Sequence, residues 1–199
     1  MAPDPSDGDP VFTKGDPVFT KGTETELHRG WFISVVRADF TDPEGTRFER
    51  DIVRHPGAVA VVPVTDDGGV LLVRQFRPAV ERWLLEIPAG TCDVEAEPPE
   101  TTARRELAEE IGRSAETLTL LTRCLNTPGF CDEVTTVYLA TDLAVVADDR
   151  QGVEERYMTV EEIPFDRFDA MVDDGSIVDA ATILGVGLAR RRLADRPGR

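Results

Sequence analysis

The stretch that decides the fold reads PAGTCDVEAEPPETTARRELAEEIG and covers residues 88–112. It opens with a tight turn at Gly90 and continues through an acidic loop into a predicted helix. Pro98 and Pro99 suit the first turn of that helix, where a missing backbone N–H is harmless. Gly112 supplies the expected end of the helix. The stretch therefore predicts a turn, a loop and a helix in close succession.

The acidic side chains of the predicted helix gather on one face. At about 100° per residue, Glu106 and Glu110 lie nearly in line, with Glu109 to one side. The apolar side chains fall toward another sector that can face a core: Ala103, Leu107 and Ile111. Neighbouring carboxylates repel one another at neutral pH. The acidic face is therefore either a solvated surface or a site for a hard divalent cation such as Mg2+ or Mn2+.

The composition bounds the kind of protein. The 199 residues suffice for one sizeable domain with a core. A net charge of -16 argues against nucleic acid as a bulk electrostatic partner. It does not exclude a small phosphorylated substrate, because bound cations can invert the local field. The three cysteines lack C-x-x-C spacing, which makes a zinc site or a disulfide framework unexpected.

The N-terminal residues have the composition of a tail. Residues 1–22 are predicted to be disordered and carry the repeat GDPVFTK at 8–14 and 15–21. They are acidic and rich in Pro and Gly, unlike a signal peptide, and no apolar run in the chain reaches the length of a membrane span. We therefore expect a cytoplasmic protein without a membrane partner, with a single domain over residues 23–195.

Strands and helices alternate along the rest of the chain. The N-terminal strand pair is expected at about residues 30–54. Strands are predicted at residues 31–40, 47–54, 58–64, 70–73, 83–87, 118–124, 133–140 and 155–160. Besides the acidic helix, further helices are expected at residues 163–172 and 176–193. This alternation predicts the α/β class with a mixed β-sheet.

The spacing within residues 90–112 resembles the Nudix box, G-x5-E-x7-R-E-U-x-E-E-x-G-U, in which U is a bulky aliphatic residue. Seven typed positions fall in register: Glu97, Arg105, Glu106, Leu107, Glu109, Glu110 and Gly112. Two features depart from the pattern, because six residues separate Gly90 from Glu97 and the last U position is Arg113. Neither departure removes a metal-ligand candidate. The resemblance therefore favours the cation site over the solvated face.

Three flanking segments make the chain similar to the ADP-ribose pyrophosphatase branch of that family: RQFR at 74–77, EIPAG at 86–90 and TPGFCDE at 127–133. The resemblance implies an α/β/α sandwich with an N-terminal β-strand extension. It also implies hydrolysis of ADP-ribose to AMP and ribose 5-phosphate. The alternatives are another nucleoside diphosphate sugar, such as GDP-mannose or a UDP-sugar, and a catalytically silent nucleotide sensor. The intact box carboxylates disfavour the sensor.

Pyrophosphate hydrolysis needs cations that neutralise the phosphate oxygens, activate a water and hold the geometry. The resemblance implies that Glu106 and Glu110, then Glu109, bind Mg2+ or Mn2+, with the backbone carbonyl of Ala89 as a further ligand. Arg105 is expected either to fix a box carboxylate or to form an ordinary surface ion pair.

A general base is also needed. The resembled branch takes it from a loop outside the box, and Glu133 matches that loop by its context. The alternatives are that Glu133 is a solvated carboxylate at a strand edge and that Glu109 is the base.

The substrate contacts expected from the sequence lie outside the box. Arg77 and Arg82 are suited to binding phosphates. Glu86 either accepts a hydrogen bond from a ribose or base, or forms a salt bridge with Arg77. Trp31 or Phe32 either stacks on the adenine across a dimer interface, as the resemblance implies, or lies in the core. Because similar enzymes exchange their N-terminal strands between subunits, we expect a homodimer.

Overall fold

The computed structural model describes residues 16–147 and 155–195. The chain divides into two compact units, one of residues 1–57 and 127–133 and the other of residues 58–126 and 134–199. The N-terminal strands thus form a unit of their own with the loop at 127–133, whereas the sequence predicts one domain over residues 23–195. Each unit is described separately below.

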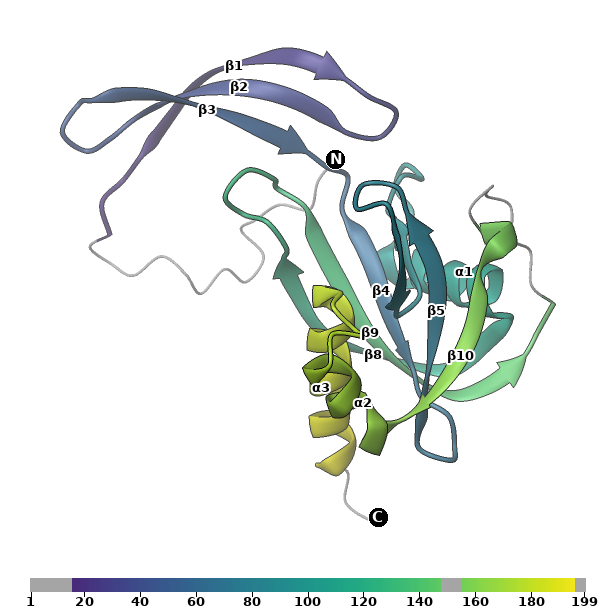
Figure 1. The fold of residues 1–199 in the computed structure, drawn as a ribbon. Coiled ribbons are helices and arrows are strands. Elements are labelled where there is room, and N and C mark those ends of the chain that lie inside the picture. The colour runs from purple at the N-terminus through teal and green to yellow at the C-terminus, as the bar shows by residue number, and fades with distance from the viewer. Residues whose placement is uncertain (1–15, 148–154, 196–199) are drawn as a thin grey trace. The chain divides into compact units, whose positions relative to one another are not determined.

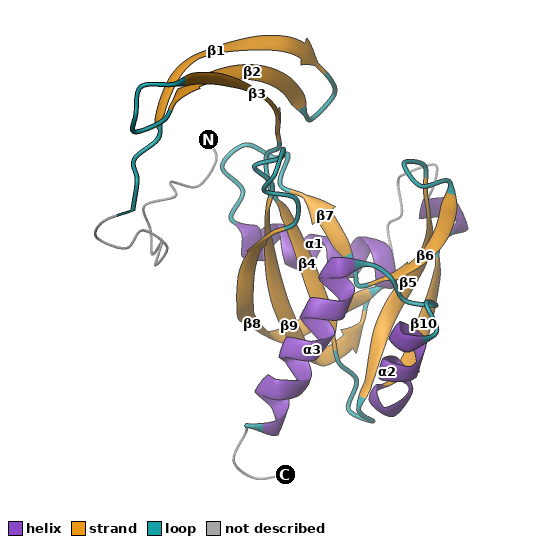
Figure 2. Cartoon of the chain, turned by 60° about the vertical axis from the view of Figure 1, so that its left-hand side comes forward, coloured by secondary structure: helices purple, strands orange, loops and turns teal. Residues whose placement is uncertain are grey.

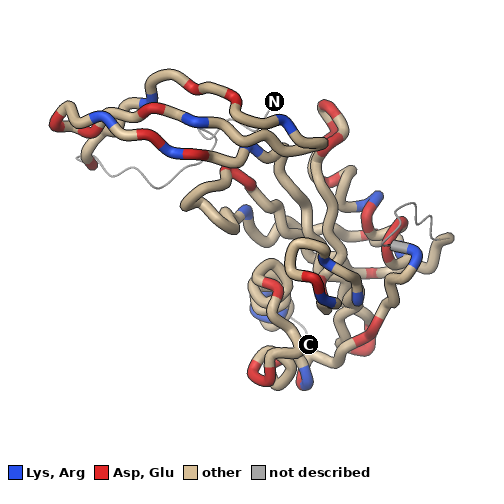
Figure 3. Tube along the Cα trace, turned by 45° about the horizontal axis from the view of Figure 1, so that its top comes forward, with Lys and Arg blue, Asp and Glu red and all other residues tan. Residues whose placement is uncertain are grey.

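The first unit is built on an antiparallel sheet of β1 (Thr20–Arg29), β2 (Ser34–Thr41) and β3 (Arg47–Arg54), in that order (Figure 1). Acidic and basic residues are interspersed along these strands (Figure 3). Arg37 lies directly opposite Asp51 and donates to both of its carboxylate oxygens, at 2.8 and 3.0 Å. Cross-strand pairs of opposite charge support the register of such a sheet.

Arg54 joins three parts of this unit. It forms an ion pair with Glu24 of β1 at 2.5 Å and with Asp132 of the 127–133 loop at 2.9 Å. Hydrogen bonds from Arg54 and then Lys21 lower the pKa of Glu24 to about 2. The backbone N–H of Val53 donates to the carbonyl of Phe130 at 2.7 Å, which ties the loop to β3.

The sequence does not predict β1. The tail expected at residues 1–22 must end earlier, because Thr20, Lys21 and Gly22 belong to this strand; residues 1–15 lie outside the described residues. All ten residues of β1 are exposed, so the strand lacks the apolar alternation that marks a half-buried strand. Its pairing with β2 defines it instead.

The second unit contains two sheets. A mixed sheet has the order β7-β4-β9-β8, with β4 and β9 parallel, and an antiparallel sheet has the order β10-β5-β6. The strands are β4 (Ala58–Pro63), β5 (Gly69–Arg77), β6 (Arg82–Glu86), β7 (Ala89–Thr91), β8 (Arg113–Leu125), β9 (Val134–Val145) and β10 (Thr159–Pro164).

Helices cover both faces of the mixed sheet, with α1 (Pro99–Ile111) on one side and α3 (Ala180–Ala194) on the other (Figure 2). Val59 and Val61 of β4 pack in the cluster that contains Leu107 of α1, whereas Val62 packs in the cluster that contains Val186 of α3. A strand buried on both faces explains the continuous apolar run at residues 58–64. The α/β/α sandwich with a mixed sheet is confirmed.

The ends of α1 agree with the sequence analysis. Pro98 precedes the helix, Pro99 is its first residue, and Gly112 ends it with a left-handed φ of 61°. The N–H of Gly112 donates to the carbonyl of Ala108 at 3.1 Å. This geometry suits glycine, which lacks the Cβ that disfavours positive φ.

The C-terminal elements differ from the expected boundaries. The strand predicted at 155–160 is replaced by a short 3-10 helix, η1 (Glu155–Tyr157), followed by β10, which pairs with β5. Helix α2 spans Phe165–Asp173. Helix α3 begins later than predicted because Asp179 caps it, accepting from the N–H of Thr182 at 2.8 Å. Within the described ranges, no helix is long and apolar enough to cross a membrane.

Candidate active site

The second unit contains a pocket of about 300 Å³ at the junction of β5, β7 and α1. The residues that line it are Gln75, Phe76, Arg77, Ala89, Gly90, Thr91, Asp93, Arg105, Glu106 and Glu110. Five of them were singled out from the sequence as site residues: Arg77, Ala89, Arg105, Glu106 and Glu110. The fold therefore brings together segments that lie before, within and after the acidic loop.

Glu106 fits against Gly90 so closely that no other residue could occupy position 90 without displacement. A Cβ at Gly90 would lie 2.0 Å from Oε1 and 2.1 Å from Cδ of Glu106. Glu106 itself is only 8% exposed. The box glycine therefore makes room for a buried carboxylate in the middle of α1.

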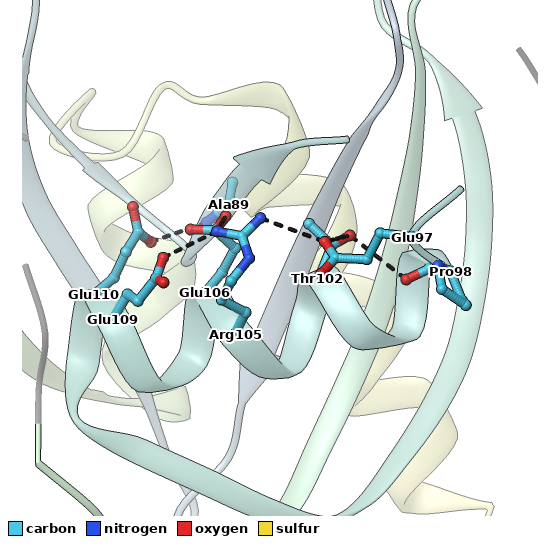
Figure 4. Close-up of polar contacts among 8 residues, drawn as sticks. All are labelled: Ala89, Glu97, Pro98, Thr102, Arg105, Glu106, Glu109 and Glu110. Carbon is cyan, nitrogen blue, oxygen red and sulfur yellow. Dashed lines mark hydrogen bonds and ion pairs between the residues drawn. The ribbon is translucent and has the colours of Figure 1, made fainter. Parts of the chain in front are cut away.

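Arg105 connects the acidic residues of the box (Figure 4). Its Nη1 contacts Oε1 of Glu106 at 2.9 Å and Oε2 of Glu109 at 3.0 Å, and its Nη2 lies 3.5 Å from Oε2 of Glu97. Partial burial acts to lower the pKa of Arg105, but the nearby carboxylates, led by Glu106, raise it overall. Arg105 thus holds several carboxylates at once, which goes beyond a single surface ion pair.

A second hydrogen bond secures Glu97. The hydroxyl of Thr102, which is fully buried, donates to Oε2 of Glu97 at 2.7 Å. Two side chains of α1, Thr102 and Arg105, thereby hold Glu97, even though the loop between Gly90 and Glu97 is one residue longer than the box pattern.

Glu110 lies beside the predicted backbone ligand. The N–H of Ala89 donates to Oε2 of Glu110 at 3.0 Å, and Glu110 is 6% exposed. Ala89 belongs to β7, which pairs with β4 of the mixed sheet. The sheet therefore fixes the backbone against which this carboxylate rests.

The donor set has the chemistry of a site for a hard cation. Glu97, Glu106 and Glu109 share the single guanidinium of Arg105, and Glu110 adds a further buried carboxylate. Buried negative charge in excess favours a divalent cation with oxygen ligands. Within residues 16–147 and 155–195, however, no three acidic, His or Cys side chains converge as a metal-binding group.

Arg77 and Glu86 form a pair on the β5–β6 ribbon. The Nε of Arg77 donates to Oε2 and Oε1 of Glu86 at 2.9 and 3.2 Å. Burial raises the pKa of Glu86, while the charge of Arg77 opposes that shift. The salt bridge that the sequence allowed is therefore present. Arg82 is exposed and stands opposite Arg77 in the strand pairing, but it does not line the pocket.

Two predicted site residues belong to the first unit. Glu133 is the last residue of the 127–133 loop, and Trp31 follows β1. Trp31 is 99% exposed, and Phe32 is about half exposed beside the ring of His55, so the alternative that either lies in the core is wrong. The roles of Glu133 and Trp31 at the site stay predictions.

Sequence analysis missed Thr102 and Gln75. The sequence does not indicate that Thr102, and not Thr101, bonds to Glu97, because this depends on where Glu97 lies in space. Gln75 did carry a signal: in a strand it shares one face with Arg77, two residues along. That alternation could have placed both side chains in the same pocket.

Comparison with known proteins agrees with this site. Residues 54–180 match the model of the NUDIX domain. An ADP-ribose pyrophosphatase from Bacillus subtilis (strain 168) is 39% identical over 161 residues, covering 81% of this chain and 86% of that protein. Another from Mycobacterium tuberculosis (strain ATCC 25618 / H37Rv) is 41% identical over 160 residues, covering 80% and 77% respectively. The chain therefore belongs to the Nudix hydrolase family.

A solved structure supports the fold. The crystal structure of an ADP compounds hydrolase matches with a TM-score of 0.77, covering 92% of this chain and 97% of that one, at 22% sequence identity.

Proposed function

We propose that this protein hydrolyses the pyrophosphate bond of ADP-ribose to AMP and ribose 5-phosphate, with Mg2+ or Mn2+ as the cofactor. The observation that carries the proposal is the buried pair Glu106 and Glu110, packed against Gly90 and Ala89 in one pocket with Arg77. The names of the two pyrophosphatase relatives support the choice of ADP-ribose. Nudix hydrolases generally use a divalent metal, which agrees with the acidic character of the pocket.

In this proposal Glu106, Glu109 and Glu110 bind the cation together with the carbonyl of Ala89. When bound, the cation neutralises the phosphate oxygens and lowers the pKa of a water. Arg105 restricts the rotamers of Glu106 and Glu109 through its contacts at 2.9 and 3.0 Å.

Glu133 is the proposed general base. It takes a proton from the water whose oxygen bonds to phosphorus, while the bond from phosphorus to the bridging oxygen breaks and the second phosphate leaves. Glu109 is the rival base. Glu133→Gln should lower turnover and leave metal affinity intact, whereas Glu109→Gln should weaken metal binding. Normal turnover of Glu133→Gln would refute Glu133 as the general base.

Arg77 is the proposed clamp for the substrate phosphates. Because Glu86 holds its Nε, the guanidinium has a fixed orientation. In this arrangement Glu86 acts on the substrate only indirectly, by orienting Arg77. Arg82 provides a second cationic side chain, on β6. We further propose that Trp31 stacks on the adenine.

The substrate is tested with a panel of ADP-ribose, GDP-mannose and a UDP-sugar, each with Mg2+ or Mn2+. Release of the nucleoside monophosphate is measured. Preference for ADP-ribose is expected. A preference for GDP-mannose would refute the substrate and keep the chemistry, and activity on none of the panel would favour a nucleotide sensor.

We also propose a homodimer in which the β1–β3 sheet is exchanged between subunits. Support comes from the exposure of all ten residues of β1 and of the large side chains Phe19, Leu27, Trp31 and Phe32. Exposed apolar groups of this size mark interaction surfaces when they gather in one patch. A monomeric mass in solution would refute the dimer.

A further inference from the structure

Gln75 is a buried polar residue of β5 with one unsatisfied hydrogen-bond donor. It is 6% exposed, and its Nε2 lacks a hydrogen-bond partner. Across the described ranges, one other buried side-chain nitrogen or oxygen is in the same state, Nε of Arg105, and both residues line the same pocket. Both unpaired atoms are N–H donors.

An unpaired buried donor destabilises a fold, and such groups are rare in folded proteins. Glu86 is an internal candidate as a partner, because Gln75 makes the smallest of the contributions that oppose the burial that raises the pKa of Glu86. Yet Glu86 is already occupied by Arg77, and Nε2 of Gln75 makes no hydrogen bond of normal geometry. The donor is therefore available to a molecule that enters the pocket.

We propose that Gln75 contacts the substrate, with its Nε2 donating a hydrogen bond to an oxygen acceptor of the bound nucleoside diphosphate sugar. This inference rests on the proposed function and adds a specificity-determining residue to it. The acceptor is either a phosphate oxygen or a hydroxyl of the terminal sugar. Gln75 and Arg77 share one face of β5 two residues apart, so both can reach one ligand.

The test compares Gln75→Met with the unaltered protein. Methionine has a similar length and no N–H donor. Leu72→Met is the matched control, because Leu72 is fully buried in the same strand and does not line the pocket. The probe is α,β-methylene-ADP-ribose, whose bridging carbon prevents hydrolysis, and its affinity is measured by calorimetry in Mg2+.

Loss of a hydrogen bond to substrate should weaken binding of the probe by Gln75→Met roughly 10-fold to 100-fold. Leu72→Met should bind like the unaltered protein. The melting temperature of Gln75→Met should equal or exceed that of the unaltered protein, because the unpaired donor is gone. Undiminished binding by Gln75→Met, whether or not it melts lower, would overturn the inference.

A second probe, α,β-methylene-ADP, lacks the terminal sugar. Weaker binding of both probes by Gln75→Met assigns the contact to a phosphate, and weaker binding of only the ADP-ribose analogue assigns it to the sugar. Failure of the unaltered protein to bind either probe would overturn the proposed function and this inference together. Normal binding by the unaltered protein with no loss in the variant overturns the inference alone.

Discussion

Replacing Gly90 with alanine should disable hydrolysis through a single methyl group. The added Cβ would lie 2.0 Å from Oε1 and 2.6 Å from Cγ of Glu106, whereas such contacts are essentially never shorter than 3.0 Å. The Glu106 side chain must therefore move by about 1 Å or more. Because Glu106 is buried and forms an ion pair with Arg105, this movement also disturbs the position of the Arg105 guanidinium.

A misplacement of about 1 Å at a reacting centre can cost about 100-fold in rate. We therefore expect Gly90→Ala to lower kcat/KM on ADP-ribose by about that factor. Crowding of this kind typically lowers the free energy of unfolding by about 1–3 kcal/mol. Thermal melts measured beside the kinetics separate the two effects, because a folded but inactive variant locates the damage at Glu106.

The matched control is Gly187→Ala in α3. A Cβ at Gly187 meets nothing within 4 Å, and alanine in a helix gains up to about 1 kcal/mol over glycine. This variant should melt slightly higher and keep its activity. Equal kcat/KM for Gly90→Ala and Gly187→Ala would refute the reasoning that the glycine exists to admit Glu106.

Three further outcomes follow from the contacts. Thr102→Val removes the 2.7 Å hydrogen bond to Glu97 and should lower the free energy of unfolding by about 1 kcal/mol, measured by chemical denaturation; an unchanged value would contradict this. Because Arg54 lowers the pKa of Glu24 from 4.5 to about 2, the stability from this pair is present above pH 4.5 and lost as the pH falls toward 2. Melts of Glu24→Gln should lack that part of the acid dependence, and identical profiles would disprove it. Burial raises the pKa of Glu86 above 4.5, so its stabilising contribution is present below pH 4.5 and lost as the pH rises through the raised pKa. Glu86→Gln should remove this loss of stability. An equal fall in the free energy of unfolding of the variant and the unaltered protein would contradict the prediction.

The helix α1 could be predicted closely because its signals are local. Pro98, Pro99 and Gly112 set its ends, and the helical period separates Leu107 from Glu106. The parallel pairing of β4 with β9 could not be predicted, since it joins segments far apart in the chain and no local pattern encodes the partner. Strand β1 was not predicted because all of its residues are exposed and it lacks an apolar alternation.

In the site, too, local sequence signals predict some features, and the spatial arrangement decides the others. The box spacing anticipated that Glu106 and Glu110 share a face, and Arg105 meets Glu109 four residues along the helix. The hydrogen bond from Thr102 and the unpaired donor of Gln75 depend on atomic positions that spacing alone does not give.

The most direct test of the central claim is AMP release from ADP-ribose by the unaltered protein and by Glu106→Gln, across a titration of Mg2+ and Mn2+. The unaltered protein should release AMP only when the cation is present. Glu106→Gln should fold and lose at least about 100-fold in kcat, because it gives up a buried carboxylate ligand. Cation-independent release of AMP, or equal rates for the two proteins, would contradict the account.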